Sequence, residues 1–323
     1  YPENEPLCVM PVFYIECRVT WAPRVRWRVK DYEPLEKVRL FIRLARPDTR
    51  IDVEGDRINL SYGVPLSPQY GAAGGGAVEV DQTDAAVAHV QERLISLNED
   101  ASPTEGEDGS RGLTLDLPVT EEDSGTKWRL VWVAHCGDEI LQAGGHKGRF
   151  RYVRHWPDID DLTRDALEHR SDYLLHSRRF EKLLEQAPLG AAHEHLLHLG
   201  FQSYLSNTFW CDLDDGSEWF SNWEGTCKFH STIDVEYNVS MFYFALWPRL
   251  LELTIDQWTR YGHAHDPSGG TYLSHDVGSD LTADGQAYPH AMEVEENCNF
   301  LLLLHALAHW TGLAGPGAHR LGG

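Results

Sequence analysis

The chain has 323 residues, of which 42% are apolar and 11% aromatic, enough to bury a sizeable core. Its formal net charge of −22 repels phosphate, which excludes a nucleic-acid partner. Because no run of about eighteen apolar residues is present, we expect no membrane span and no membrane partner. The sequence does not fix the compartment, and we favour the cytoplasm.

Metal and cofactor motifs are not found in the sequence. The cysteines are scattered without CxxC spacing, which argues against a structural zinc site or a dense disulfide framework. His193-Glu194-His195 begins like a metalloprotease helix, but the HExxH motif requires His where Leu197 stands. GxSxG, P-loop and GxGxxG patterns are also missing. We therefore expect no metal and no cofactor.

Up to about residue 155, short alternating apolar segments are separated by turn-rich stretches. Strands are predicted at 12–19, 25–29, 38–44, 113–119 and 128–134. Several short strands separated by turn-rich stretches predict an antiparallel β-sandwich. One segment, 84–97, has Val87, Val90, Leu94 and Leu97 at helical spacing, which favours a helix or an irregular crossing segment.

After residue 155 the pattern becomes helical. Helices are predicted at 156–186, 190–206, 233–261 with a break or kink at Pro248, and 293–311. Long loops at 207–231 and 262–292 carry most of the tryptophans and acids of this half. Paired helices with such connections predict a helical toroid whose loops build a sugar-sized cleft.

The segment from Trp219 to Gly225 is the strongest local feature. Glu224 lies close to two indoles, which can desolvate a carboxylate and tune its pKa. The indole faces of Trp219 and Trp223 can stack on a sugar ring, and Gly225 can allow a close approach. The alternative is that Glu224 caps the helix that begins near Thr232.

Two further groups admit both a ligand-binding and a structural interpretation. Asp234 lies in the first turn of a predicted helix, where an acid is favourable with or without a ligand. His275 and Asp276 either contact a ligand or form an Asp-supported turn. Glu293, Glu295 and Glu296 precede an apolar helix, and we attribute them to the helix dipole.

Several of these motifs recur together in one known group of enzymes. Residues 201–210 (FQSYLSNTFW), 214–216 (DDG), 222–225 (NWEG) and 231–234 (STID) resemble glycoside hydrolase family 52, the β-xylosidases. Residues 242–253 and 274–278 are more similar to the related family 116 β-glucosidases. This resemblance covers about 195–311 and implies a β-sandwich ahead of an (α/α)6 barrel. We accordingly divide the chain into a sandwich at 1–155, a linker helix at 156–188 and the N-terminal part of the barrel at 189–323.

The resemblance also assigns roles to residues. Glu224 falls on the catalytic nucleophile, and Asp234 and His275 fall on positions that bind the sugar in the −1 subsite, with Asp276 beside them. A retaining glycosidase uses a second carboxyl group about 5–5.5 Å from the nucleophile to protonate the leaving oxygen. In the family this acid lies well C-terminal to the His-Asp-x-Gly segment, so we expect it beyond residue 323, although Asp276 or Glu295 could supply the proton.

The helical pattern provides far fewer helices than an (α/α)6 barrel requires. We therefore expect this chain to be part of a longer protein, unstable or inactive alone, and completed by a C-terminal barrel segment or by a homo-oligomer. The leading hypothesis is a retaining exo-glycosidase that takes a carbohydrate substrate with a β-linkage. Two rivals stay open: an inactive carbohydrate-binding paralogue, and an amidohydrolase, since residues 284–288 and 292–301 resemble fungal glutaminase A.

Overall fold

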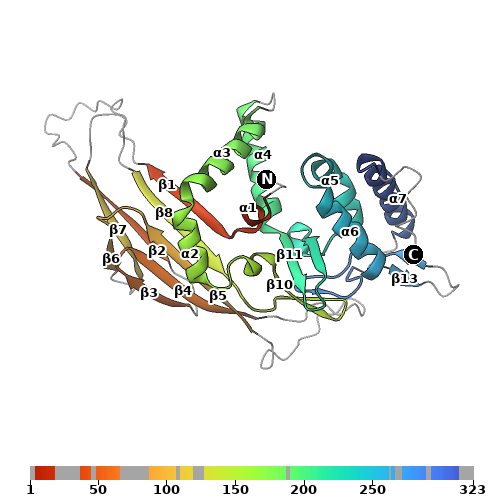
Figure 1. Cartoon of the computed structure of the whole chain (residues 1–323), viewed down its shortest axis with the longest axis horizontal. Helices are drawn as coiled ribbons and strands as arrows, with labels where there is room; N and C mark the ends of the chain where they lie inside the picture. The colour runs from red at the N-terminus through yellow and green to blue at the C-terminus, as the bar shows by residue number, and fades with distance from the viewer. Residues whose placement is uncertain are drawn as a thin grey trace.

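The computed structural model describes residues 4–18, 37–44, 49–65, 87–106, 110–118, 127–186, 190–261, 263–265, 271–288 and 292–312. Sheets dominate the N-terminal half at one end of the molecule, and a cluster of helices lies at the opposite end (Figure 1). The strand predicted at 25–29 lies outside the described residues. Among the described helices, none is long and apolar enough to cross a membrane.

Two antiparallel sheets form the β-sandwich that the sequence predicts. The larger contains β1 (Val12–Arg18), β8 (Lys127–His135), β5 (Val87–Ser96), β4 (Arg57–Pro65) and β3 (Arg50–Glu54), in that order. The smaller contains β2 (Lys37–Leu44), β7 (Arg111–Pro118) and β6 (Ser102–Glu105). Side chains from both sheets form one buried apolar cluster, which includes Ile58, Leu94, Leu113, Leu115 and Trp128. This cluster is the core of the sandwich.

The helix considered for 84–97 is wrong for the described part of this segment, because Val87–Ser96 form strand β5. It pairs antiparallel with β4 on one side and β8 on the other. Ala88 and Leu94 are buried while Val87 is exposed, so the apolar residues do not share one helical face. The spacing of three to four residues arose by coincidence within a central strand that has neighbours on both sides.

A third sheet joins the two halves of the chain. Its order is β12 (Glu218–Asn222), β11 (Thr208–Leu213), β10 (His146–Phe150), β9 (Leu141–Ala143) and β15 (Thr282–Ala283). Strands β9 and β10 precede residue 155, whereas the others come from the segments predicted as loops. Backbone hydrogen bonds therefore hold residues 141–150, which precede residue 155, to strands from the second half of the chain.

The helical prediction after residue 155 is confirmed, with one extra break. The helices are α2 (Ile159–Glu168), α3 (Arg170–Glu185), α4 (Ala191–Ser206), α5 (Ile233–Leu246), α6 (Pro248–Tyr261) and α7 (Glu293–Trp310), and a short α1 (Glu5–Val9) lies near the N-terminus. Helix α2 packs on β8 of the sandwich through Leu162 and Ala166. Helices α5, α6 and α7 lie against one another (Figure 1) around buried Tyr243, Trp258 and Leu303.

The predicted (α/α)6 barrel is wrong for the part of the chain that the structure describes. Those residues form seven α-helices: α1 near the N-terminus, α2 on the sandwich, a protruding α3–α4 pair and the α5–α7 cluster. A five-stranded sheet lies between the last two groups (Figure 1). The barrel was what the family resemblance implied, and the loop predicted at 207–231 is also wrong in part. Phe209, Cys211 and Leu213 are buried at every second position, the period of a strand, and this segment pairs as the β11–β12 hairpin.

Candidate active site

The candidate site lies where β12 ends, α5 begins and residues 274–280 cross between them. Three backbone hydrogen bonds fix these segments: Ser231 donates to Asn222 at 2.8 Å, His230 to Gly278 at 2.8 Å, and Ile233 to His275 at 3.0 Å. The last of these satisfies an N–H in the first turn of α5, which has no partner within the helix. The start of α5 is therefore held against the loop that carries His275.

Glu224 follows β12 directly and faces the start of α5. Its Oε2 accepts a hydrogen bond from the Thr232 hydroxyl at 3.0 Å, and its backbone N–H donates to Phe229 at 2.9 Å. Thr232 is the N-cap of α5, but its side chain makes no cap hydrogen bond. The carboxylate thus engages the side chain of the N-cap residue, while remaining half-buried at the surface of the site.

The backbone conformation at position 225 favours glycine. Its φ is +47°, in the left-handed region, and a Cβ built on it would meet nothing within 4 Å. No protein atom approaches Gly225 closely, and the expectation that glycine allows a substrate to approach at this position stays a prediction. The left-handed residue turns the chain out of β12, so that the Glu224 side chain is presented at the turn.

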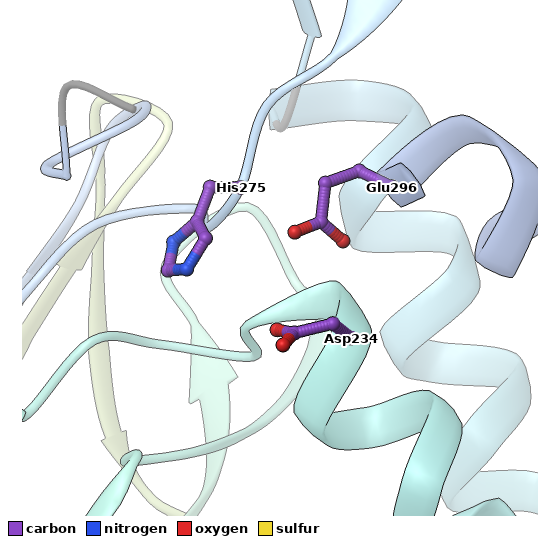
Figure 2. A group of neighbouring side chains, drawn as sticks. All are labelled: Asp234, His275 and Glu296. Atoms are coloured by element: carbon purple, nitrogen blue, oxygen red, sulfur yellow. The ribbon is translucent and has the colours of Figure 1, made fainter. Parts of the chain in front are cut away.

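Asp234, His275 and Glu296 form the tightest polar cluster of the site (Figure 2). One oxygen or nitrogen atom from each lies within 4.8 Å of the others. Asp234 comes from the first turn of α5, Glu296 from the first turn of α7, and His275 from the loop after β14 (Thr271–Leu273), which pairs with β13 (His263–His265). The structure thus brings the two predicted residues together and adds a third.

Glu296 and His275 are buried in this cluster, and Asp234 is half-buried. Glu296 is 1% exposed and His275 8% exposed. Asp234 Oδ1 and both carboxylate oxygens of Glu296 have no hydrogen-bond partner. Burial and the Asp234 charge raise the pKa of Glu296 to about 7, against a smaller opposing effect of His275 and of the nearby Asp234 backbone N–H. Two carboxylates and an imidazole are donors that sugar hydroxyls or a divalent cation can use.

Asp276 is an anchor within the protein. It is fully buried and accepts hydrogen bonds from the backbone N–H groups of Gly278 at 2.9 Å, Ala287 at 2.8 Å and Tyr288 at 3.0 Å. Its Oδ2 lies 3.0 Å from His275 Nδ1. Burial alone would lower the pKa of His275, but the hydrogen bond and charge of Asp276 raise it above the usual value. Asp276 therefore supports the turn and orients the imidazole.

The two tryptophans named from the sequence differ in exposure. Trp219 is 1% exposed, and its indole N–H donates to Ser221 at 2.8 Å, so both ring faces are covered by the core. Trp223 is half-buried; its N–H donates to the Asp280 carbonyl at 2.8 Å. The aromatic ring of Tyr288, which is 37% exposed, lies 4.9 Å from the His275 ring. Tyr288 and Trp223 therefore keep exposed surface, as does the half-buried Phe229, whose ring lies 5.9 Å from the His275 ring.

A buried polar network supports the strand that presents Glu224. Asn222 Nδ2 donates to Glu236 Oε1 at 3.0 Å and also contacts the Tyr243 hydroxyl. Burial raises the pKa of Glu236 to about 7, although the hydrogen bonds that Glu236 makes with Asn222 and Tyr243 lower it. Sequence reasoning missed Glu236 and Glu296. A signal existed, because Glu296 shares its helical face with the buried Leu303 and Leu307 and is the acid on that stripe.

Comparison with known proteins gives the class of this enzyme. Residues 119–295, more than half of the chain, match the family model of glycosyl hydrolase family 52. The protein is therefore a glycoside hydrolase. It belongs to glycosyl hydrolase family 52, which confirms that resemblance. The match includes Glu224, Asp234 and His275 and ends one residue before Glu296. No curated protein matches the chain. Similarity to family 116 and to glutaminase A stays a prediction.

Proposed function

We propose that this protein is a retaining exo-glycosidase that hydrolyses a β-linked sugar, as a β-xylosidase or β-glucosidase does. The observation that carries this proposal is the placement of Glu224. It stands at the end of β12, hydrogen-bonded to Thr232 at the start of α5, next to the helix turn that bears Asp234. A half-buried carboxylate fixed through one oxygen has its other oxygen available for attack.

In the proposed reaction Glu224 is the nucleophile. One carboxylate oxygen bonds to the anomeric carbon while the bond to the leaving oxygen breaks and an acid protonates that oxygen. Water then attacks the glycosyl-enzyme, and Glu224 is released as a carboxylate with net retention of configuration. The hydrogen bond from Thr232 holds the carboxylate in one rotamer, which lowers the cost of reaching the attack geometry.

The −1 subsite in this proposal is formed by Asp234 and His275. They would accept and donate hydrogen bonds to sugar hydroxyls and strengthen them as charge develops at the anomeric carbon. Asp276 acts behind them by fixing His275. Trp223 and Tyr288 have the exposed ring surface to stack on a sugar, whereas the buried Trp219 would act by supporting the hairpin.

Which residue protonates the leaving oxygen is a question separate from the identity of the nucleophile. Both oxygens of Asp276 accept hydrogen bonds from the protein, and Glu295 is exposed on α7, outside the cluster that Glu296 joins. Neither arrangement favours a proton donor beside Glu224, so we propose an acid C-terminal to the His275-Asp276 segment, as the family resemblance implies. The amidohydrolase alternative gains no support, because Asn297 links α7 to β14 through hydrogen bonds with the Glu293 carbonyl and the Leu273 N–H.

Trapping of the glycosyl-enzyme tests this function. An activated 2-deoxy-2-fluoro-β-xyloside and the corresponding glucoside would be incubated with the protein, and the labelled peptide identified by mass spectrometry. We expect a covalent sugar on Glu224 and no label in Glu224→Gln, whereas Glu295→Gln should label normally. A sugar on another carboxylate, or hydrolysis that releases the inverted anomer, would contradict the proposal. Sugar binding without turnover would favour the inactive paralogue.

A further inference from the structure

One histidine beside the candidate site is completely buried and has no part in the proposed reaction. His230 is 0% exposed and stands between β12 and the loop after β14. Its backbone N–H donates to Gly278 at 2.8 Å, and its carbonyl accepts from Val277 at 3.1 Å. It also forms a bridge pair with Trp223, the residue before Glu224. His230 therefore connects the segment of the proposed nucleophile with the loop that carries proposed sugar-binding groups.

The backbone around His230 is held in an unfavourable conformation. Among the described residues, the non-glycine residues with positive φ are Lys228 at 57°, Ser231 at 46° and Asp280 at 53°. Two of them flank His230 in the chain, and the carbonyl of the third lies 2.7 Å from His230 Nε2. Residues with a Cβ are costly in this conformation and persist there only where surrounding contacts hold them. The turn that follows Glu224 therefore requires a local restraint.

The hydrogen bonds of His230 fix which ring nitrogen carries the proton. A carbonyl oxygen only accepts, so the 2.7 Å contact with the Asp280 carbonyl requires an Nε2–H. Nδ1 is then an acceptor for the Ser221 hydroxyl at 2.8 Å, and Ser221 in turn accepts from the Trp219 indole at 2.8 Å. The Trp223 N–H lies 3.2 Å from Nε2 but 2.8 Å from the Asp280 carbonyl, so it donates to the carbonyl. The neutral imidazole thus links the core of the hairpin to the carbonyl that holds Trp223.

The surroundings of His230 favour this neutral form. Complete burial lowers the pKa of His230 to about 4, although the Asp280 carbonyl and the charges of Asp276 and Asp280 raise it. Lys228 offsets one of these charges, since its Nζ lies 2.7 Å from Asp280 Oδ1. A proton on Nδ1 would also break the hydrogen bond that Ser221 donates. The ring is therefore neutral at pH values near 7.

We propose that His230 is a positioning residue for the nucleophile: its Nε2–H holds the Asp280 carbonyl, and through it Trp223 and the turn of Glu224. This inference rests on the function proposed for Glu224. Because the ring is fully buried, it has no contact with substrate and acts only through these neighbours. A reacting group that is displaced by about 1 Å costs about 10²-fold in rate, so the effect should appear in kcat.

Two substitutions of His230 remove different halves of this hydrogen-bonded chain. The amide of glutamine falls near Nε2 of the ring that it replaces, so His230→Gln keeps a donor for the Asp280 carbonyl. The amide of asparagine falls near Nδ1, so His230→Asn keeps only the bond with Ser221. We expect both to lower the melting temperature. His230→Asn should lower kcat by about 10²-fold with KM changed less than about threefold, whereas His230→Gln should keep kcat within about tenfold of wild type.

Hydrogen exchange in peptides that cover 222–231 gives a readout that needs no hydrolysis. Exchange there should be faster in His230→Asn than in His230→Gln. Leu115→Ala is the control for lost stability, because it removes packing from the sandwich core, and it should change neither kcat nor the exchange of this segment. Equal kcat or equal exchange in the two His230 variants would overturn the proposal.

NMR of the histidine ring nitrogens in the wild type decides if neither His230 variant folds. At about pH 5.5, where exposed histidines are mostly charged, the His230 ring should remain neutral with its proton on Nε2. A charged ring or a proton on Nδ1 would overturn the proposal. Wild-type protein whose Glu224 takes no label from the fluoro-glycoside would instead overturn the proposed function, and the exchange measurement would still decide whether His230 holds the turn.

Discussion

The β-sandwich and the region around α5 differ in what they bury. The sandwich core is made of aliphatic and aromatic side chains such as Ile58, Leu115 and Trp128. Around α5 the buried side chains include His230, Glu236, Asp276 and Glu296. Ionisable groups are costly to bury, and proteins concentrate them where chemistry or binding needs shifted pKa values. The contrast indicates that the sandwich provides stability and that the α5 region trades stability for function.

Replacing the proposed nucleophile should produce the largest effect on activity. We expect Glu224→Gln to lower kcat by at least about 10⁴-fold, because covalent catalysis is lost, while the melting temperature changes little. The measurement is steady-state hydrolysis of an aryl β-glycoside that the wild type accepts. Glu54→Gln, an exposed acid on β3 of the sandwich, is the control and should retain full activity. Near-wild-type kcat in Glu224→Gln would remove Glu224 from the mechanism.

Creating a cavity in the sandwich core should lower stability and leave the activity unchanged. Leu115 is 2% exposed in the core, and Leu115→Ala should lower the free energy of unfolding by about 2–5 kcal/mol. Denaturant unfolding gives this value, and kcat of the folded fraction should stay unchanged. If Leu115→Ala alters kcat instead, the sandwich contributes to the geometry of the site and the contrast between the regions fails.

Substitutions of the proposed sugar-binding residues should affect activity less than Glu224→Gln and more than Leu115→Ala. We expect Asp234→Ala and His275→Ala each to lower kcat/KM by hundreds-fold, because a hydrogen bond to a charged group contributes about 1.5–3 kcal/mol and each residue can make two. The anomer released should not change. Thermal melting must accompany the kinetics, since Asp234 also lies at a helix N-terminus. A large loss of stability with normal kinetics would make Asp234 a structural residue.

Acid should have two opposing effects on the α5 region: burial of His230 lowers stability as the pH falls, whereas burial of Glu236 and Glu296, whose pKa values are raised to about 7, increases it. Complete burial lowers the pKa of His230 to about 4. The unfolded chain binds this proton near pH 6.5, so stability is fully present above pH 6.5 and is lost as the pH falls toward 4. The expected loss is at most about 3 kcal/mol. The difference between wild type and His230→Asn in urea unfolding from pH 7 to pH 4 isolates this loss from the opposite contributions of Glu236 and Glu296. His230→Asn should be less stable at pH 7 but show a shallower pH dependence, and an unchanged slope would assign the effect elsewhere.

The sequence predicts secondary structure correctly where apolar residues recur with a single period along a segment. The helices after residue 155 were predicted because apolar spacing, Pro248 and first-turn acids agreed, and the sandwich strands because alternation and turns agreed. The β11–β12 hairpin was missed because tryptophans and acids were interpreted as loop chemistry, although the burial period of Phe209 and Cys211 is two.

The candidate site likewise contains residues that the sequence identifies and residues that it does not. Glu224, Asp234 and His275 stand in recognisable local motifs, so a resemblance could identify them. Glu236 and Glu296 could not be found in this manner, because their importance depends on burial against other elements. Asn222 and Tyr243 surround Glu236, and Asp234 and His275 face Glu296, from segments that the sequence does not show to be adjacent. Tertiary contacts of this kind are not encoded in local spacing.

The sheet shared by both halves of the chain also constrains how this protein can fold during synthesis. Gln142 of β9 donates a hydrogen bond at 2.7 Å to Asp284, which lies 142 residues later in the chain. The outer edges of β9 and β10 therefore stay unpaired until β15 and β11, respectively, have left the ribosome. Pairings of such long sequence separation form slowly, and open strand edges favour association. The protein should thus depend on chaperones during translation more than its separate sandwich and helices would.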